Sequence, residues 1–197
     1  KAEGIDVLAG TNTPPDFQNL FKACMDGGVT PGAITMGKCC LLAGDVQSLE
    51  DAIPGGANGI MTEVWWTPEY PFSSDFTGMS SADLGAKYTE DTGRDMPQPA
   101  GYAYASLELA LNAFKQAGTL DKAAVRDALA ATDLNTIVGP IKYDKEMMGL
   151  TYSDTVIAGG QWQQQADGTE KLFVIDNTVY EMIPTNGEFK AGNALKK

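Results

Sequence analysis

Short apolar runs alternate with helical segments over the first 66 residues, and few folds accommodate this order. Apolar runs occupy residues 5–9, 33–43 and 59–66. Residues 17–28 between the first two runs have helical spacing and end at two glycines, and a short helix is expected to start near Asp45. Short apolar strands separated by helices are typical of a parallel sheet that helices cover on both faces. We therefore predict an α/β fold with a β-α-β-α-β opening.

The middle of the chain has helical spacing without strands of its own. Residues 80–93, 103–118 and 121–132 follow one another as helical segments, with serine caps at the first and glycines closing the first two. The tail returns to strands around the turn at 167–168. Helices with one apolar stripe need a sheet to cover, so we expect part of a second sheet to be missing from this chain.

Composition excludes several classes of function. The net charge of -12 disfavours nucleic acid and anionic lipid as partners. The chain has no histidine, which removes histidine-dependent nucleophilic, acid-base and metal chemistry. Cys24, Cys39 and Cys40 lack the spacing of a zinc or redox motif. We expect no catalytic residue, metal or cofactor; the cysteines are buried thiols, or Cys24 is bridged to one of the other two.

Several short motifs occur in an order typical of one family. They are the aromatic and proline-rich segment Trp65–Phe72, Tyr88–Gly93, Ala117-Gly118, Val125–Leu129, Gly139-Pro140 with Tyr143-Asp144, and Gly160–Gln163. Over roughly residues 5–175 the chain resembles the second half of type I periplasmic substrate-binding proteins, in the group that delivers branched-chain amino acids, amides or urea to ABC importers. Each motif is weak alone, and their order makes the resemblance specific.

The resemblance implies two α/β lobes that are joined by three crossing segments and enclose a ligand. The fold class expected is then the parallel-sheet lobe of a two-lobed periplasmic-binding-protein-like type I fold, with part of the other lobe missing. Residues 1–66 would belong to the second lobe, 67–143 to a crossing segment and first-lobe helices, and 144–197 to the return crossing and the C-terminal strands.

The same resemblance implies a solute-binding component of an ABC import system rather than an enzyme. It would bind a small polar molecule, such as an amino acid, amide, urea or small carboxylate, and deliver it to a membrane permease. Its location would be periplasmic or extracytoplasmic, with lipid anchoring through a missing N-terminus as one option. The further partner would be the missing N-terminal half, or a second copy bound through exposed apolar surface. A ligand-sensing domain on the same fold, such as a receptor ectodomain or an amide-responsive regulator, is the alternative.

Ligands of open α/β sheets bind outside the carboxyl ends of the strands. The turn at Thr11, Asn12 and Thr13 follows the first strand and offers hydroxyl, amide and backbone N–H groups. Lys38 interrupts the second apolar run, where an unpaired buried ammonium is costly. The resembling family's amino-acid binders have an acidic residue near this position, so the lysine favours an anionic or carbonyl ligand. Turn chemistry, a solvent-directed lysine head and a Lys38–Glu63 ion pair are the structural alternatives.

The third strand runs into an aromatic segment that supplies the last candidates. Trp65 and Trp66 point in opposite directions if the strand continues, so at most one should face a ligand. Tyr70 follows between two prolines that stiffen the crossing. We expect one tryptophan and Tyr70 to form an apolar wall; the alternatives are that both tryptophans lie in the core and that Tyr70 is a hinge residue.

Overall fold

The computed structural model describes residue 4 and residues 6–195. The chain divides into two compact units, Lys1–Val64 with Ala158–Lys197 and Trp65–Ile157. We call them the sheet unit and the helical unit. Because the chain changes unit between Val64 and Trp65, the paired tryptophans open the helical unit. The assignment of segments to lobes of a larger protein stays a prediction.

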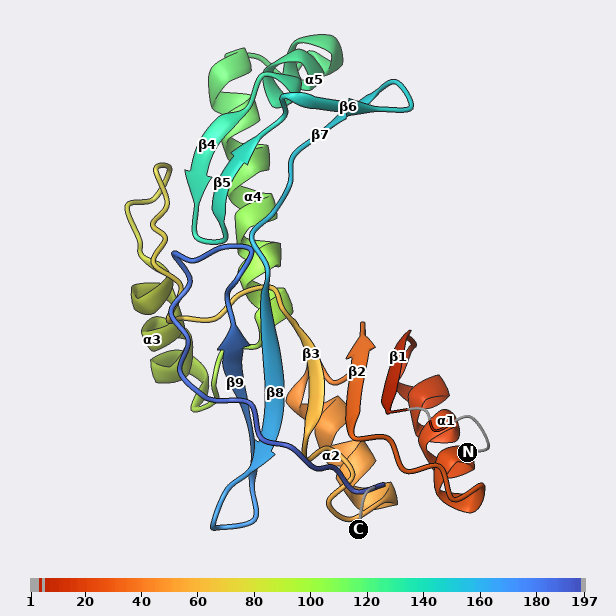
Figure 1. Cartoon of the computed structure of the whole chain (residues 1–197). Helices are drawn as coiled ribbons and strands as arrows, with labels where there is room; N and C mark the ends of the chain where they lie inside the picture. The colour runs from red at the N-terminus through yellow and green to blue at the C-terminus, as the bar shows by residue number, and fades with distance from the viewer. Residues whose placement is uncertain (1–3, 5, 196–197) are drawn as a thin grey trace. The chain divides into compact units, whose positions relative to one another are not determined.

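The sheet unit contains a mixed five-stranded sheet in the order β1-β2-β3-β8-β9 (Figure 1). Strands β1 (Val7–Thr11), β2 (Ala33–Gly37) and β3 (Ile60–Val64) are parallel to one another. Strands β8 (Ala158–Gln164) and β9 (Glu170–Asp176) continue the sheet as antiparallel neighbours. The predicted α/β class and its three parallel strands are confirmed; Ile5, in the first predicted strand, lies outside the described residues.

Helices α1 (Pro14–Asp26) and α2 (Ala43–Ala52) pack against the sheet. Their buried side chains form one core with alternate residues of the strands: Phe17, Phe21, Cys24, Val46, Leu49, Ile34, Met36, Ile60 and Trp162. Residues of one parity along β2 and β3 share a face of the sheet, so both helices cover that same face. Gln161 and Gln163 alternate with Trp162 along β8 and so face the opposite side of the sheet. Their side chains donate to the carbonyls of Lys190 and Glu188, each at 2.8 Å. The expectation of helices on both faces is therefore wrong for these two helices.

Strand β2 is shorter than its apolar run. It ends at Gly37, and Lys38 and Cys40 then have positive φ angles of 60° and 57°. Such left-handed residues cannot continue a strand, so Cys39 and Cys40 lie in a turn. All three cysteines are buried, free thiols, with the Sγ atoms of Cys39 and Cys40 3.7 Å apart. The hypothesis of buried thiols is therefore confirmed, and the alternative of a disulfide from Cys24 is wrong.

The helical unit begins with the aromatic segment and continues into α3 (Ser81–Thr92), α4 (Gln98–Ala117) and α5 (Lys122–Ala130). Ser80 caps α3, and Gly93 ends it in a left-handed conformation, as predicted. Helix α4 starts five residues before its predicted start at 103 because Pro99 fits the first helical turn, where no N–H bond is required.

Two antiparallel hairpins follow the helices. They are β4 (Asp133–Thr136) with β5 (Gly139–Lys142), and β6 (Lys145–Met147) with β7 (Leu150–Tyr152). The second hairpin was not predicted, since its strands have only three residues each and are exposed on both sides. Short strands of this kind carry no alternation that a sequence pattern can detect.

Candidate functional site

The carboxyl ends of β1 and β2 bring polar residues together at one edge of the sheet. Thr11 pairs with Gly37 at the end of both strands, and the Asn12 N–H donates to the Gly37 carbonyl at 3.2 Å. Thr13 is exposed and directs its hydroxyl to Asp16 at 2.6 Å, in the first turn of α1. Thr11 is also exposed, whereas Asn12 is half-buried. Backbone pairing therefore fixes this turn and leaves the Thr11 hydroxyl at the surface.

Lys38 lies directly after β2, in the tight turn. It is exposed, and its own N–H donates to Oε1 of Glu63 at 2.8 Å. The buried Thr62 hydroxyl lies 3.1 Å from the carbonyl oxygen of Met36 and 3.0 Å from that of Cys39. A hydrogen bond from this hydroxyl therefore ties the turn to β3. The lysine does not sit inside a strand, which removes the burial cost that first drew attention to it.

Glu63 lies at the same end of the sheet. The sequence suggested it only as a partner of Lys38 in an ion pair. Among the described residues it forms no ion pair with Lys38, and its contact is to the lysine backbone. A methyl group built on Gly37 would lie 3.2 Å from the Thr11 hydroxyl oxygen and 3.3 Å from Oε2 of Glu63. A hydroxyl and a carboxylate thus flank the same glycine. We call Thr11, Asn12, Gly37, Lys38 and Glu63 the carboxyl edge.

The carboxyl edge offers hydrogen-bond donors and acceptors to a small polar molecule. Thr11 offers a donor and acceptor, Glu63 an acceptor and Lys38 three donors. Among residues 6–195, no group of three or more acidic or cysteine side chains is placed to hold a metal ion. The sequence offered one signal for Glu63, since it is a charged residue within the third apolar run, two residues before Trp65.

Trp66 is a core residue of the helical unit. Its side chain is fully buried, and Nε1–H donates to the Ile137 carbonyl at 2.9 Å and to the Ser81 hydroxyl at 3.2 Å. The Ser81 hydroxyl donates to the same carbonyl at 2.7 Å. The indole also lies against Gly101 of α4, where a Cβ atom would come within 2.4 Å of it. Trp66 is therefore the tryptophan that packs inward.

Trp65 and Tyr70 have different surroundings. Trp65 is half-buried, and its backbone N–H donates to Oε1 of Gln98 at 2.8 Å. Its ring and the Tyr102 ring pack edge to face with a centroid distance of 5.8 Å. Tyr70 is 3% exposed and packs edge-on against Phe72. Burial, with a smaller effect of Tyr102, raises the pKa of the Tyr70 hydroxyl well above its usual value. Trp65 is thus the more accessible of the two tryptophans.

The structure divides the predicted site residues between the two units. Thr11, Asn12, Thr13 and Lys38 lie together in the sheet unit, and Trp65, Trp66 and Tyr70 lie in the helical unit. No ligand contact tests these residues, so their roles stay predictions.

The sheet unit is an α/β unit whose strand ends carry polar side chains. The periplasmic binding protein family matches residues 1–166 of the 197, and the chain belongs to this family. Membership of the family indicates an extracytoplasmic location. The resemblance drawn from the sequence motifs is confirmed.

Solved structures share the fold at low identity. The leucine binding protein LivK from Thermotoga maritima MSB8 has a TM-score of 0.64 and 16% identity over 85% of this chain and 43% of its own. An ABC transporter substrate-binding protein from Sphaerobacter thermophilus has a TM-score of 0.60 and 16% identity, over 87% and 44%. An ABC-type branched-chain amino acid transporter from Rhodopseudomonas palustris CGA009 has a TM-score of 0.50 and 11% identity, over 94% and 63%.

The chain spans less than two thirds of each of these structures. At such low identity the likeness is one of fold. No curated protein sequence matches the chain. Within the part of the chain that the structure describes, no helix has the length and apolar character needed to cross a bilayer.

Proposed function

We propose that the chain is the solute-binding component of an ABC importer and that its carboxyl edge binds the polar head of a small molecule. One observation carries this proposal. The Thr11 hydroxyl and the Glu63 carboxylate lie on either side of Gly37, next to the turn at Lys38, at the carboxyl ends of parallel strands. Open α/β sheets bind their ligands at this end. Binding without turnover is the expected activity.

The ligand class we propose is an amino acid or a similarly charged small molecule. Lys38 alone would favour an anionic or carbonyl group, but Glu63 adds a carboxylate to the same edge. A zwitterion satisfies both charges, since Glu63 can accept from an ammonium group while Lys38 donates to a carboxylate. Amides, urea and small carboxylates would use only part of this set.

Calorimetry on the full-length protein tests the proposal. L-leucine, acetamide, urea and propionate serve as probes, one from each class. We expect Lys38→Ala and Glu63→Gln each to weaken leucine binding by about 1–3 kcal/mol, the range for a lost charged hydrogen bond. Propionate binding, if present, should respond to Lys38→Ala alone.

Lys22→Ala is the matched control, because Lys22 is an exposed lysine on α1 of the same unit. It should bind every probe as the parent does. If Lys38→Ala and Glu63→Gln both bind like the parent, the ligand site lies elsewhere.

A second part of the proposal concerns the exposed face of α4. Leu107, Leu111 and Phe114 are 64%, 52% and 45% exposed, on the stripe predicted to cover a sheet. We propose that the remainder of a two-lobed protein covers this face, and that the whole protein delivers its solute to a membrane permease. The partial coverage of the structural neighbours supports the first point.

Light scattering on the 197-residue chain alone checks the α4 face. Exposed apolar patches promote association, so the chain should self-associate, and Leu111→Glu should shift it toward monomer. A chain that stays monomeric at high concentration, with or without Leu111→Glu, contradicts the proposal.

A further inference from the structure

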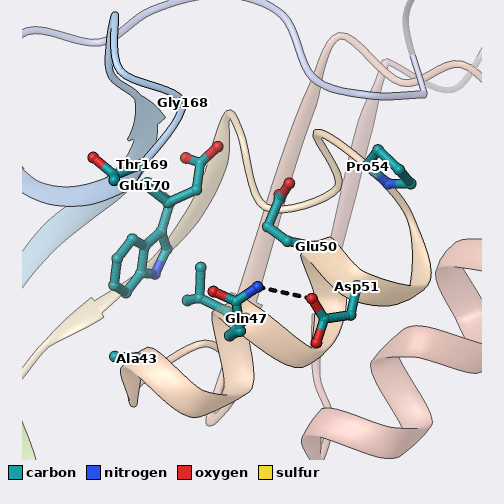
Figure 2. Close-up of a pocket in the computed structure, with 10 residues that line it drawn as sticks. Ala43, Gln47, Glu50, Asp51, Pro54, Gly168, Thr169 and Glu170 are labelled. Atoms are coloured by element: carbon teal, nitrogen blue, oxygen red, sulfur yellow. Dashed lines mark hydrogen bonds between the residues drawn. The ribbon is translucent and has the colours of Figure 1, made fainter.

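A pocket lies within the sheet unit, between α2 and the β8–β9 hairpin. Its volume is about 430 Å³, within the range of small-molecule sites. Figure 2 shows Gln47, Glu50 and Asp51 along α2 on one side and Thr169 and Glu170 of the hairpin on the other. It is lined by none of the carboxyl-edge residues, so it is separate from the ligand site proposed above.

Glu170 is the unusual residue of this pocket. Both of its carboxyl oxygens are shielded from solvent and have no hydrogen-bond partner among the described residues. An ionised carboxylate in such a position is costly unless a cation pairs with it. Burial, followed by repulsion from Glu50, raises the pKa of Glu170 to about 7. A cation in the pocket would stabilise the ionised form of Glu170.

The other walls of the pocket are fixed by contacts of their own. Glu50 accepts the N–H groups of Gly55 at 2.8 Å and Ala57 at 2.7 Å. The Trp162 indole is held by an Nε1–H bond to the Cys40 carbonyl at 2.8 Å. An aromatic wall beside carboxylates attracts organic cations, which contact the ring face while pairing with the acids. Because Glu50 and Trp162 are already held by these hydrogen bonds, they need little reorganisation on binding.

A metal ion fits these residues less well than an organic cation does. Within residues 6–195, no three acidic side chains lie close enough to hold one ion, so Glu50, Asp51 and Glu170 are spread around the pocket. A cation that carries its own N–H donors can supply the hydrogen bonds that Glu170 lacks. An aliphatic linker would fill the space beside Trp162.

We propose that this pocket binds a small organic cation with ammonium N–H donors, held against the Trp162 indole by Glu170 and by the α2 carboxylates Glu50 and Asp51. This site is additional to the solute site at the carboxyl edge. It would make binding of an amine a second property of the sheet unit.

Titration calorimetry with 1,4-diaminobutane at pH 8 on the full-length protein tests the inference. We expect saturable binding to one site, weakened at least tenfold by Glu170→Gln and severalfold by Asp51→Asn. Glu90→Gln is the matched control, because it removes the same charge from an exposed position on α3 and should change binding less than twofold. Lys38→Ala should leave diaminobutane binding unchanged, which separates this site from the carboxyl edge.

Four outcomes would overturn the inference. The first is an absence of saturable heat with the folded parent protein. The second is parental affinity in both Glu170→Gln and Asp51→Asn, with folding checked by circular dichroism. The third is equal weakening by Glu90→Gln, which would indicate attraction by net charge alone. The fourth is competition by calcium chloride at equal concentration, which would identify a metal site.

Discussion

Replacing Gly101 with alanine would test whether Trp66 is fixed in the core of the helical unit. A Cβ atom at this position would lie 2.4, 2.6 and 2.7 Å from Cδ2, Cε3 and Cγ of Trp66. Carbon atoms in contact normally stay about 3.5–4.0 Å apart, so the indole or α4 must move by about 1 Å. The Nε1–H bonds to Ile137 and Ser81 oppose a movement of the indole.

The magnitude follows from three opposing effects. Overpacking costs about 1–3 kcal/mol, and a weakened indole hydrogen bond costs about 0.5–1.5 kcal/mol. Alanine is the better helix former by about 1 kcal/mol, which offsets part of this cost. We expect Gly101→Ala to destabilise the helical unit by about 1–3 kcal/mol.

Urea unfolding followed by circular dichroism and tryptophan fluorescence measures this change. Gly44→Ala in α2 is the matched control, because no atom lies within 4 Å of the Cβ it would add. The control should be as stable as the parent or up to about 1 kcal/mol more stable. A Gly101→Ala protein that is equally stable would refute the packing described for Trp66.

Three further substitutions have expected outcomes. Without an amine ligand, the ionised form of Glu170 is disfavoured in the folded state, because its pKa is raised from 4.5 to about 7. Glu170→Gln should therefore stabilise the protein above pH 7 and not below pH 4.5; the full shift would correspond to about 3 kcal/mol, and solvent screening reduces this to about 1–2 kcal/mol. Parallel stability curves from pH 4 to 8 would contradict this. Thr62→Val removes the hydroxyl that holds the carbonyls of Met36 and Cys39, and should cost about 1–3 kcal/mol in chemical denaturation. Asp121→Ala removes the cap of α5, whose carboxylate accepts two N–H groups of its first turn, and should lower stability by about 1 kcal/mol; an unchanged melting temperature would count against the cap.

Local patterns in the sequence were sufficient for the α/β class and for many of the element ends. Alternating apolar runs predicted the three parallel strands, and Ser80 and Gly93 predicted the ends of α3. These signals depend on residues within a few positions of one another, and the same short-range physics operates in the folded chain. The family resemblance has the same origin, since its motifs mark strand ends and helix caps in a fixed order.

The tertiary structure decided which side chains meet at the candidate sites. The apolar run around Lys38 gave no sign of the left-handed turn, which depends on Thr62 and Glu63 from the neighbouring strand. The two tryptophans are adjacent in the sequence, and packing against Gly101 together with hydrogen bonds to Ser81 and Ile137 makes Trp66 the core residue.

The pocket between α2 and the β8–β9 hairpin depends on tertiary structure most of all. Residues 43–54 and 162–170 come together there because β8 pairs with β3 across more than ninety intervening residues. Periodicity in the sequence gives the face of each element but not the register or partner of a distant strand. Contacts of that range form only when the whole sheet assembles, and therefore the unpaired Glu170 could be recognised only in the folded unit.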